Sequence, residues 1–216
     1  MAGRLVVFEG VEGAGKTTQL QRLCRRLDRN GIENSPFREP GGTVLGDEIR
    51  SLLLQPGSPV APASEALLFM ASRAQLIEKA VRPALSRGHV VLLDRFFLST
   101  YAYQVVGRRL EEASVRAANA LAVGDLVPDV TILLLLSVSE GMTRVGRRGT
   151  RDRMESEPEL FHARVEGAFA SFDDPAWQAA HPEAGPIVAV DASGAPEDVE
   201  ERVWQVVAAA CPEVQG

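Results

Sequence analysis

The amino-acid sequence predicts an α/β fold in which a doubly wound, five-stranded parallel sheet is flanked by helices. Short apolar runs alternate with longer helix-like stretches along the 216 residues, and this order of elements builds such a sheet. The strand-like runs are apolar throughout, as expected of strands that are buried on both faces. A glycine-rich phosphate-binding motif also joins the first strand to the first helix, which is where this fold binds nucleotides.

Each element has its own signal in the sequence. The strand-like runs are residues 4–9, 32–37, 89–94, 130–138 and 186–191. The helix-like stretches are residues 16–29, 43–54, 63–86, 98–123, 139–147, 157–180 and 195–210. Pro62 and Pro196 lie where helices begin, and Gly31, Gly88 and Gly124 lie where helices end. Because no repeat or low-complexity linker interrupts this order, we expect residues 1–216 to form a single domain.

The composition is that of an ordinary soluble protein. Hydrophobic residues make up 45%, charged residues 24%, and the net charge is −6, which argues against a protein that coats nucleic acid. Cys24 and Cys211 form no C-x-x-C pair, so we expect two reduced thiols. The apolar run 130–136 is too short to span a membrane, and the first residues are too short for a signal peptide. We therefore expect a cytoplasmic protein with no membrane and no nucleic-acid partner.

Residues 10–17 match every position of the P-loop pattern G-x-x-x-x-G-K-[ST]. They are Gly10, Val11, Glu12, Gly13, Ala14, Gly15, Lys16 and Thr17. The glycines let the backbone wrap around a polyphosphate, and the helix that follows adds its partial positive charge. We expect Lys16 to reach the β- and γ-phosphates of ATP and Thr17 to bind Mg²⁺. The motif predicts a nucleoside triphosphate site on a P-loop NTPase fold.

The third strand-like run ends in Asp94, and Arg95 follows it. In a doubly wound sheet this position lies beside the P-loop, at the carboxyl ends of the strands. We therefore expect Asp94 near Mg²⁺ and Arg95 at a second anion. The sequence has no Asn-Lys-x-Asp guanine-reading motif, and no acid stands beside Asp94 as in many motor ATPases. These features favour a kinase over a switch or a motor.

A second group of side chains follows the second and third strand-like runs, and it comprises Arg38, Glu39, Arg50, Phe69, Arg73, Thr100, Tyr103 and Gln104. Phe69 and Arg73 are four residues apart and project from one helix face, as do Thr100 and Gln104. An aromatic ring with guanidinium, amide and hydroxyl groups can bind a flat heterocycle by stacking and by edge hydrogen bonds. Taken singly, Phe69 could instead be a core residue, and Arg50 and Arg73 could be solvated charges.

In order and spacing, these segments resemble those of thymidylate kinases, the family that transfers the γ-phosphoryl of ATP to dTMP. The resemblance runs almost from end to end, through the P-loop, residues 38–42, Phe69 to Arg73, residues 94–96, 102–104, 128–131 and the polar segment 147–155. It implies the P-loop kinase fold, a reaction that gives dTDP and ADP, Mg²⁺ as cofactor, a homodimer that forms through long helices, and a mobile lid at 147–155.

The resemblance also assigns roles at the base of dTMP. Phe69 would stack on thymine, and Arg73 would bond its O4 edge. Thr100 and Gln104 would meet the ring or its neighbours. These four residues would together bind the nucleobase.

Other residues would hold the phosphate and sugar of dTMP. By resemblance, Arg50 and Arg95 would bind the phosphate, with Arg38 close by. Glu39 and Tyr103 would lie against the deoxyribose, where a packed tyrosine disfavours a ribose 2′-hydroxyl. The acceptor would thus be a deoxynucleoside monophosphate.

The charges of the reactants indicate how the reaction is catalysed. The second pKa of the acceptor phosphate is ~6, so the nucleophile is already ionised at neutral pH and needs no general base. The protein must instead neutralise the transferring group. Lys16 is the only cation of the P-loop, so the chain resembles the class of the family that supplies arginines from the lid. We predict that Arg148 and Arg153, with Arg151 as an alternative, act with Lys16 and Arg95 in catalysis.

Some positions depart from the family pattern, and two other functions stay open. Val105 stands where the family often has glycine, and Leu135 stands where many members have aspartate, so we assign no metal role there. A deoxynucleoside kinase would need a carboxylate base for a neutral 5′-hydroxyl, and it would need fewer phosphate-binding arginines. A non-catalytic nucleotide-binding regulator could keep Lys16 and Thr17 but would not need arginines in a lid.

Overall fold

The computed structural model of the chain describes residues 3–136 and 152–215. In this part of the chain, five parallel strands form one sheet in the order β2-β3-β1-β4-β5. The strands are β1 (Arg4–Gly10), β2 (Asn34–Arg38), β3 (Val90–Asp94), β4 (Val130–Leu135) and β5 (Ile187–Asp191). This order confirms the predicted fold class.

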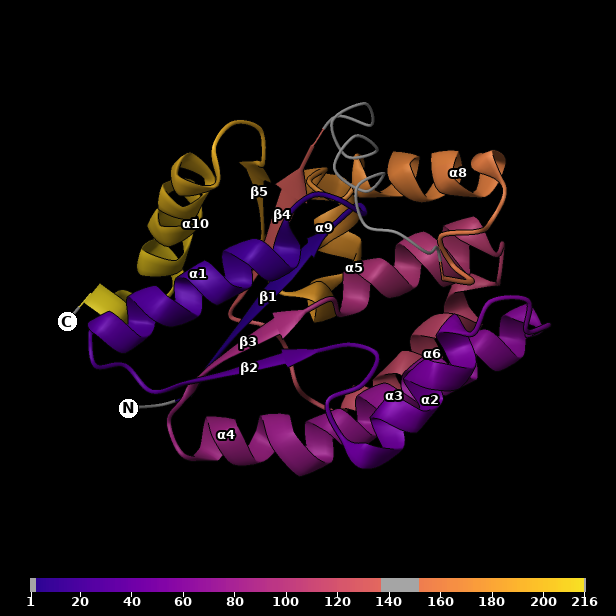
Figure 1. The fold of residues 1–216 in the computed structure, drawn as a ribbon, viewed down its shortest axis with the longest axis horizontal. Helices are drawn as coiled ribbons and strands as arrows, with labels where there is room; N and C mark the ends of the chain where they lie inside the picture. The colour runs from indigo at the N-terminus through magenta and orange to yellow at the C-terminus, as the bar shows by residue number, and fades with distance from the viewer. Residues whose placement is uncertain (1–2, 137–151, 216) are drawn as a thin grey trace.

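Helices cover both faces of the sheet (Figure 1). One face carries α1 (Lys16–Arg29) and α10 (Pro196–Ala210). The opposite face carries α3 (Pro62–Leu76), α4 (Arg82–Ser86), α5 (Phe97–Thr100) and α8 (Glu159–Phe169). The remaining described helices are α2 (Val44–Leu54), α6 (Glu112–Val123) and α9 (Pro175–Ala180), with short 3-10 turns at Pro182–Ala184 and Pro212–Gln215. None of the described helices is long and apolar enough to cross a membrane.

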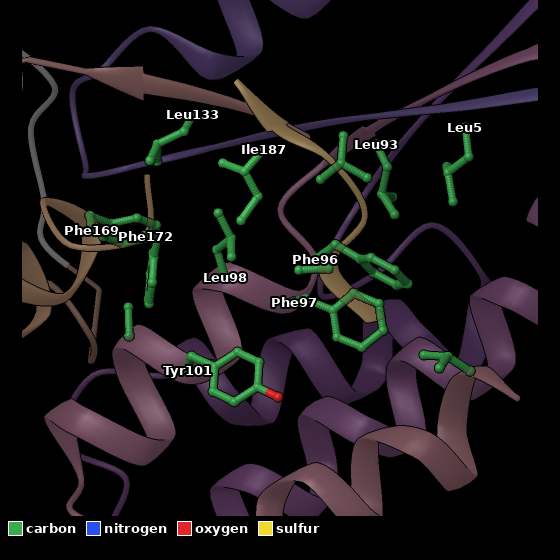
Figure 2. Close-up of a cluster of buried hydrophobic side chains, with 14 of the residues drawn as sticks. Leu5, Leu93, Phe96, Phe97, Leu98, Tyr101, Leu133, Phe169, Phe172 and Ile187 are labelled. Carbon is green, nitrogen blue, oxygen red and sulfur yellow. The ribbon is translucent and has the colours of Figure 1, made fainter. Parts of the chain in front are cut away.

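The sheet separates two apolar cores, which explains why its central strands β1, β3 and β4 carry runs of consecutive apolar residues. Successive residues of a strand point to opposite faces. Val6 and Phe8 accordingly pack under α1 and α10, whereas Leu5 packs in the other core. In that second core, Leu93 belongs to β3 and Phe96 follows it in the chain; Figure 2 shows the three residues Leu5, Leu93 and Phe96 in one cluster. The central strands thus carry apolar side chains on both faces.

Two stretches that the sequence predicts as continuous helices are interrupted, and a third stays helical but changes its helix type. Residues 63–86 form α3, a π-helical segment at Ile77–Val81 and then α4. Residues 98–123 form α5, a π-helical segment η2 (Tyr101–Gly107) and, after a break, α6. Arg109 has a φ of 59° in this break, a conformation that a helix does not allow. The stretch 157–180 divides into α8 and α9 because Asp174 caps the second helix and Pro175 begins it.

Other predicted limits differ by a residue or two, and β4 ends at Leu135 instead of residue 138. The expected helix 139–147 lies outside the described residues. Cys24 and Cys211 are both free thiols. That residues 1–216 form a single domain stays a prediction.

The fold brings the predicted site residues to one edge of the sheet. In the strand register, Asp94 lies opposite Phe8 of β1 on one side and Arg38 of β2 on the other. The P-loop follows β1, and Glu39 follows β2. Since the strands are parallel, their carboxyl ends meet at this edge, where such sheets bind their ligands.

Candidate active site

The P-loop connects β1 to α1 through a backbone that only glycine adopts easily. Gly10, Gly13 and Gly15 have φ values of 141°, 79° and 90°. A Cβ atom on Gly10 would lie 2.5 Å from the carbonyl oxygen of Leu134, so this glycine also allows β4 to approach closely. The sequence therefore forms a turn whose backbone N–H groups can face an anion.

Lys16 folds back over this turn. Its Nζ donates hydrogen bonds to the carbonyl oxygens of Gly10, at 2.9 Å, and Val11, at 2.8 Å. Burial, with the nearby charge of Arg95, lowers the pKa of Lys16 to about 7. A polyphosphate bound in the loop would offset this loss of hydration, because an adjacent anion favours the charged amine.

Thr17 and Asp94 are the two residues that the sequence assigns to Mg²⁺, and the structure brings them together. The Thr17 hydroxyl donates to Oδ2 of Asp94 over 2.6 Å. A hydroxyl and a carboxylate are hard oxygen donors, and Mg²⁺ is held by one or two such groups together with substrate phosphates. The residues present therefore fit this cation.

Two cavities adjoin at this edge of the sheet. The large cavity, of about 840 Å³, follows the P-loop and contains Lys16, Thr17 and Asp94 in its wall. The small cavity, of about 120 Å³, lies beyond it and is lined by Phe69, Arg73, Thr100, Tyr103 and Gln104. The residues that line both cavities are Glu12, Glu39, Arg50, Arg95 and Asp152. Two cations, Arg50 and Arg95, thus lie at the junction.

Arg95 is held in an unusual conformation at this junction. Its φ is 70°, and a non-glycine residue in this region stores about 1–3 kcal/mol of strain, which is most often seen at functional sites. Its Nη1 donates to the Ser99 hydroxyl at 3.0 Å, and its guanidinium lies 5.4 Å from the centre of the Tyr103 ring. Ser99 in turn donates to Glu9 at 2.7 Å. The side chain is therefore oriented before any ligand arrives.

Arg50 adds a second positive charge. Its Nη1 donates to the carbonyl oxygen of Pro40 at 2.9 Å. Burial lowers the pKa of Arg50, and the charges of Arg38 and Arg95 act in the same direction. Three arginines that repel one another around a cavity form a place where an anion would be stabilised.

Arg73 lies deep in the wall of the small cavity and is only 2% exposed, so it is not a solvated helix charge. Its Nε donates to Oε2 of Glu39 at 2.7 Å, and its Nη2 donates to the Phe96 carbonyl oxygen at 2.9 Å. Its Nη1 donates to Thr100 at 2.9 Å and to Asn119 at 2.6 Å. The arginine therefore fixes the walls of the cavity to one another.

Phe69 and Glu39 each present an unused surface to the small cavity. Phe69 is half-buried and belongs to neither apolar core of the described residues, which argues against a purely structural role. Oε1 of Glu39 is buried and has no hydrogen-bond partner among the described residues. A buried oxygen of this kind is normally paired, so a ligand hydroxyl or a water would complete it.

The lid residues that the sequence singles out are only partly described. Arg147, Arg148 and Arg151 lie outside the described residues. Arg153 is described, and its Nε donates to the Leu53 carbonyl oxygen at 2.6 Å, while its Nη2 donates to Glu65 at 2.7 Å. It is absent from the described linings of both cavities. Its catalytic role stays a prediction.

Three residues in these hydrogen-bond networks were not identified from the sequence. Glu9 accepts hydrogen bonds from the backbone N–H groups of Phe96 and Ser99, and a charged residue inside an apolar strand was the available signal. Glu65 precedes Phe69 by four residues and so shares the face of α3 that carries the predicted binding residues. Asn119 has no signal in the sequence, since its role depends only on where α6 packs.

A P-loop beside a strand-end aspartate, with arginines between two adjoining cavities, defines a P-loop nucleotide-binding protein with room for a second anionic ligand. A family model described as thymidylate kinase matches residues 8–203. This chain belongs to the thymidylate kinase family.

Individual relatives are similar over nearly the whole chain. The thymidylate kinase of Deinococcus radiodurans is 42% identical over 205 residues, which cover 95% of this chain and 96% of the relative. That of Synechococcus sp. (strain JA-3-3Ab) is 45% identical, with 94% of each chain covered. That of Thermomicrobium roseum is 44% identical over 94% of this chain and 93% of the relative.

Proposed function

We propose that this protein transfers the γ-phosphoryl of ATP to dTMP and so produces dTDP and ADP. The observation that carries this proposal is the pair of adjoining cavities with Arg50 and Arg95 in both linings. A kinase that joins two anionic substrates needs cations at the point where their phosphates meet. The P-loop would hold ATP in the large cavity, and the small cavity would hold the nucleoside of dTMP.

On the ATP side, Lys16 would bind the β- and γ-phosphates from its position over the P-loop. Thr17 and Asp94 would hold Mg²⁺, which would neutralise charge on the triphosphate and orient it. The 2.6 Å hydrogen bond between these two side chains keeps both oxygens at one place. No described group is required to act as a base, because the acceptor phosphate is ionised at neutral pH.

On the dTMP side, Phe69 would stack on thymine, while Arg73, Thr100 and Gln104 would surround its edge. Arg50 and Arg95, with Arg38 nearby, would hold the phosphate. Glu39 and Tyr103 would lie against the deoxyribose, and the unpaired Oε1 of Glu39 is an acceptor for a ligand hydroxyl or a water. The guanidinium of Arg95 lies above the Tyr103 ring, so the proposed phosphate and sugar sites would be adjacent.

A panel of acceptors tests the reaction directly. With ATP and Mg²⁺, initial rates should be far higher for dTMP than for thymidine, dCMP or dGMP. Faster turnover of thymidine than of dTMP would instead establish a deoxynucleoside kinase. ATP binding without transfer to any acceptor would establish a non-catalytic nucleotide-binding regulator.

We also propose that the protein acts in the cytoplasm as a homodimer. The helices α2, α3 and α6 lie side by side (Figure 1). They expose large apolar side chains, namely Leu52 at 55%, Leu67 at 61% and Leu121 at 88%, and exposed apolar patches often mark protein interfaces. Light scattering after size-exclusion chromatography should give twice the 23.3 kDa chain mass, and Leu121→Glu should give the monomer mass.

A further inference from the structure

Glu65 is a buried carboxylate beneath the wall of the small cavity. It lies on α3, is 0% exposed and does not line the cavity itself. Its Oε1 accepts hydrogen bonds from Gln104 Nε2 and Arg108 Nε, both at 3.0 Å. Its Oε2 accepts from Arg108 Nη2 at 2.8 Å and from Arg153 Nη2 at 2.7 Å. Neither the P-loop nor the phosphate site uses this residue.

The surroundings of Glu65 keep it ionised. Burial alone would raise its pKa, but the hydrogen bonds from Arg108, Arg153 and Gln104 hold the pKa below its ordinary value. An ionised carboxylate has no proton to donate and can only accept hydrogen bonds. The end of the Gln104 amide that meets Glu65 must therefore be its NH₂ group.

This contact determines which end of the Gln104 amide remains for a ligand. Gln104 lies on η2, is buried and lines the small cavity. Among the described residues, its Nε2 donates a hydrogen bond to Oε1 of Glu65. Its carbonyl oxygen, Oε1, is thus the end that can accept a hydrogen bond from a ligand in the cavity.

An acceptor at this position distinguishes between pyrimidine rings. Thymine presents an N3–H donor next to its O4 acceptor, whereas cytosine presents an N3 acceptor next to an amino donor. An amide carbonyl can pair with N3–H but leaves two acceptors facing each other when the ring is cytosine. An unpaired buried acceptor costs about 1–3 kcal/mol, and polar sites use such costs to reject analogues.

We propose that Glu65 is a positioning residue that holds the Gln104 amide with its carbonyl toward the small cavity, and that it thereby selects a thymine ring over a cytosine ring. The inference rests on the proposed function, because it deepens the choice of dTMP as acceptor. Glu65 acts through Gln104 and touches no substrate. Arg108 and Arg153 keep the carboxylate in place.

The chain offers a matched control. Arg108 Nη2 also donates to Glu157 Oε1, at 2.5 Å. Glu157→Gln therefore removes a carboxylate partner of the same arginine without touching Gln104. Glu65→Gln keeps the size of the side chain but can present either end of its amide to Gln104, so the orientation of Gln104 is no longer determined.

The measured quantity is the ratio of kcat/KM for dTMP to kcat/KM for dCMP. In Glu65→Gln this ratio should fall about tenfold or more, which is the effect expected when a buried acceptor loses its fixed orientation. The fall should come mainly from a higher KM for dTMP. In Glu157→Gln it should equal the wild-type ratio. Gln104→Leu should lower it as well, and adding Glu65→Gln to Gln104→Leu should change it no further.

An unchanged ratio in Glu65→Gln would overturn the proposal, as would a further fall of the same size in the Gln104→Leu background. If Glu65→Gln does not fold, Glu65→Asp replaces it, because this variant keeps the charge and withdraws the carboxylate by ~1.5 Å, about one C–C bond. A lower ratio in Glu65→Asp supports the proposal, and an unchanged ratio overturns it. The wild-type enzyme, assayed in parallel, tests the proposed function separately. If it does not phosphorylate dTMP, the proposed function fails; if it does and the ratio is unchanged in Glu65→Gln, only the role of Glu65 is refuted.

Discussion

The P-loop and the small cavity are both suited to hold part of a nucleotide, but they are built in different ways. In the P-loop, Lys16 bonds to carbonyl groups five and six residues earlier in the chain. In the small cavity, Arg73 bonds to Glu39, Thr100 and Asn119, which are 34, 27 and 46 residues away. The first site is a local property of one turn, whereas the second exists only after several elements have packed.

This difference has an energetic consequence. The proposed role of the P-loop groups is to bind an anion, so their loss should lower activity without lowering stability. The groups around Arg73 satisfy one another's buried charges, so their loss should affect both binding and stability. Substitutions at the two sites should therefore differ in whether they lower stability as well as activity.

Removing the P-loop cation should cause the largest loss of activity. Lys16→Ala should lower kcat by ~10³-fold or more, because this amine neutralises charge on the transferring phosphoryl group. Its melting temperature should be no lower than that of the wild type, because burial already disfavours the charged amine in the folded protein. Lys79→Ala, which removes the chain's other lysine at an exposed position, is the control and should retain full activity. A comparable loss of stability in Lys16→Ala would contradict the contrast between the two sites.

Single alanine variants of Arg147, Arg148, Arg151 and Arg153 test the predicted lid. Because Lys16 is the only P-loop cation, at least one variant should lose ~10²-fold or more in kcat with little change in KM. Steady-state kinetics with ATP and dTMP measure this effect. If all four variants keep a near-normal kcat, another group must neutralise the transition state.

Arg153 can be separated from the other three arginines by its contacts. Its side chain bonds to Leu53 and Glu65 in the described structure. Arg153→Ala should therefore lower the melting temperature as well, since it leaves a buried carboxylate with fewer partners. A variant that loses only kcat and keeps its stability would place Arg153 among the purely catalytic residues.

Arg73→Ala should affect binding and stability together. It should raise the KM for dTMP about tenfold while the affinity for ATP stays nearly unchanged, since a hydrogen bond from a charged donor is worth about 1.5–3 kcal/mol. It should also lower the free energy of unfolding by about 3–5 kcal/mol, because Glu39 would remain buried without its partner. Arg116→Ala breaks a more exposed ion pair with Glu183 and should cost at most about 1 kcal/mol.

The last prediction concerns the pH dependence of stability. Burial lowers the pKa of Lys16 to about 7 in the folded protein, whereas the value in an unfolded chain is about 10.4. Between these values the unfolded state binds more protons, so this residue makes stability rise with pH. Relative to Lys16→Met, the free energy of unfolding of the wild type should rise by up to ~1.4 kcal/mol per pH unit in this window. Urea unfolding at several pH values measures it, and Lys79→Met should run parallel to the wild type.

Sequence and structure agree best where interactions are local. The strand runs, α1 and the P-loop were all predicted within two residues of their observed limits, except at the end of β4. The predicted helix 63–86 is helical throughout but contains a π-helical segment, whereas the predicted helix 98–123 is broken after Gly107. A Cβ atom on Gly107 would lie 2.7 Å from the Phe161 ring of α8, a contact between segments far apart in the chain.

The sequence alone determined the nucleotide-binding turn, the apolar strands on either side of it and the group of arginines at the strand ends. These features depend on neighbouring residues and on the periods of a strand and a helix. The hydrogen bonds of Arg73 with Glu39 and Asn119, and of Gln104 with Glu65, depend instead on how distant elements pack. A hydrogen bond has a donor and an acceptor end, and which ends meet depends on side chains that only packing brings together.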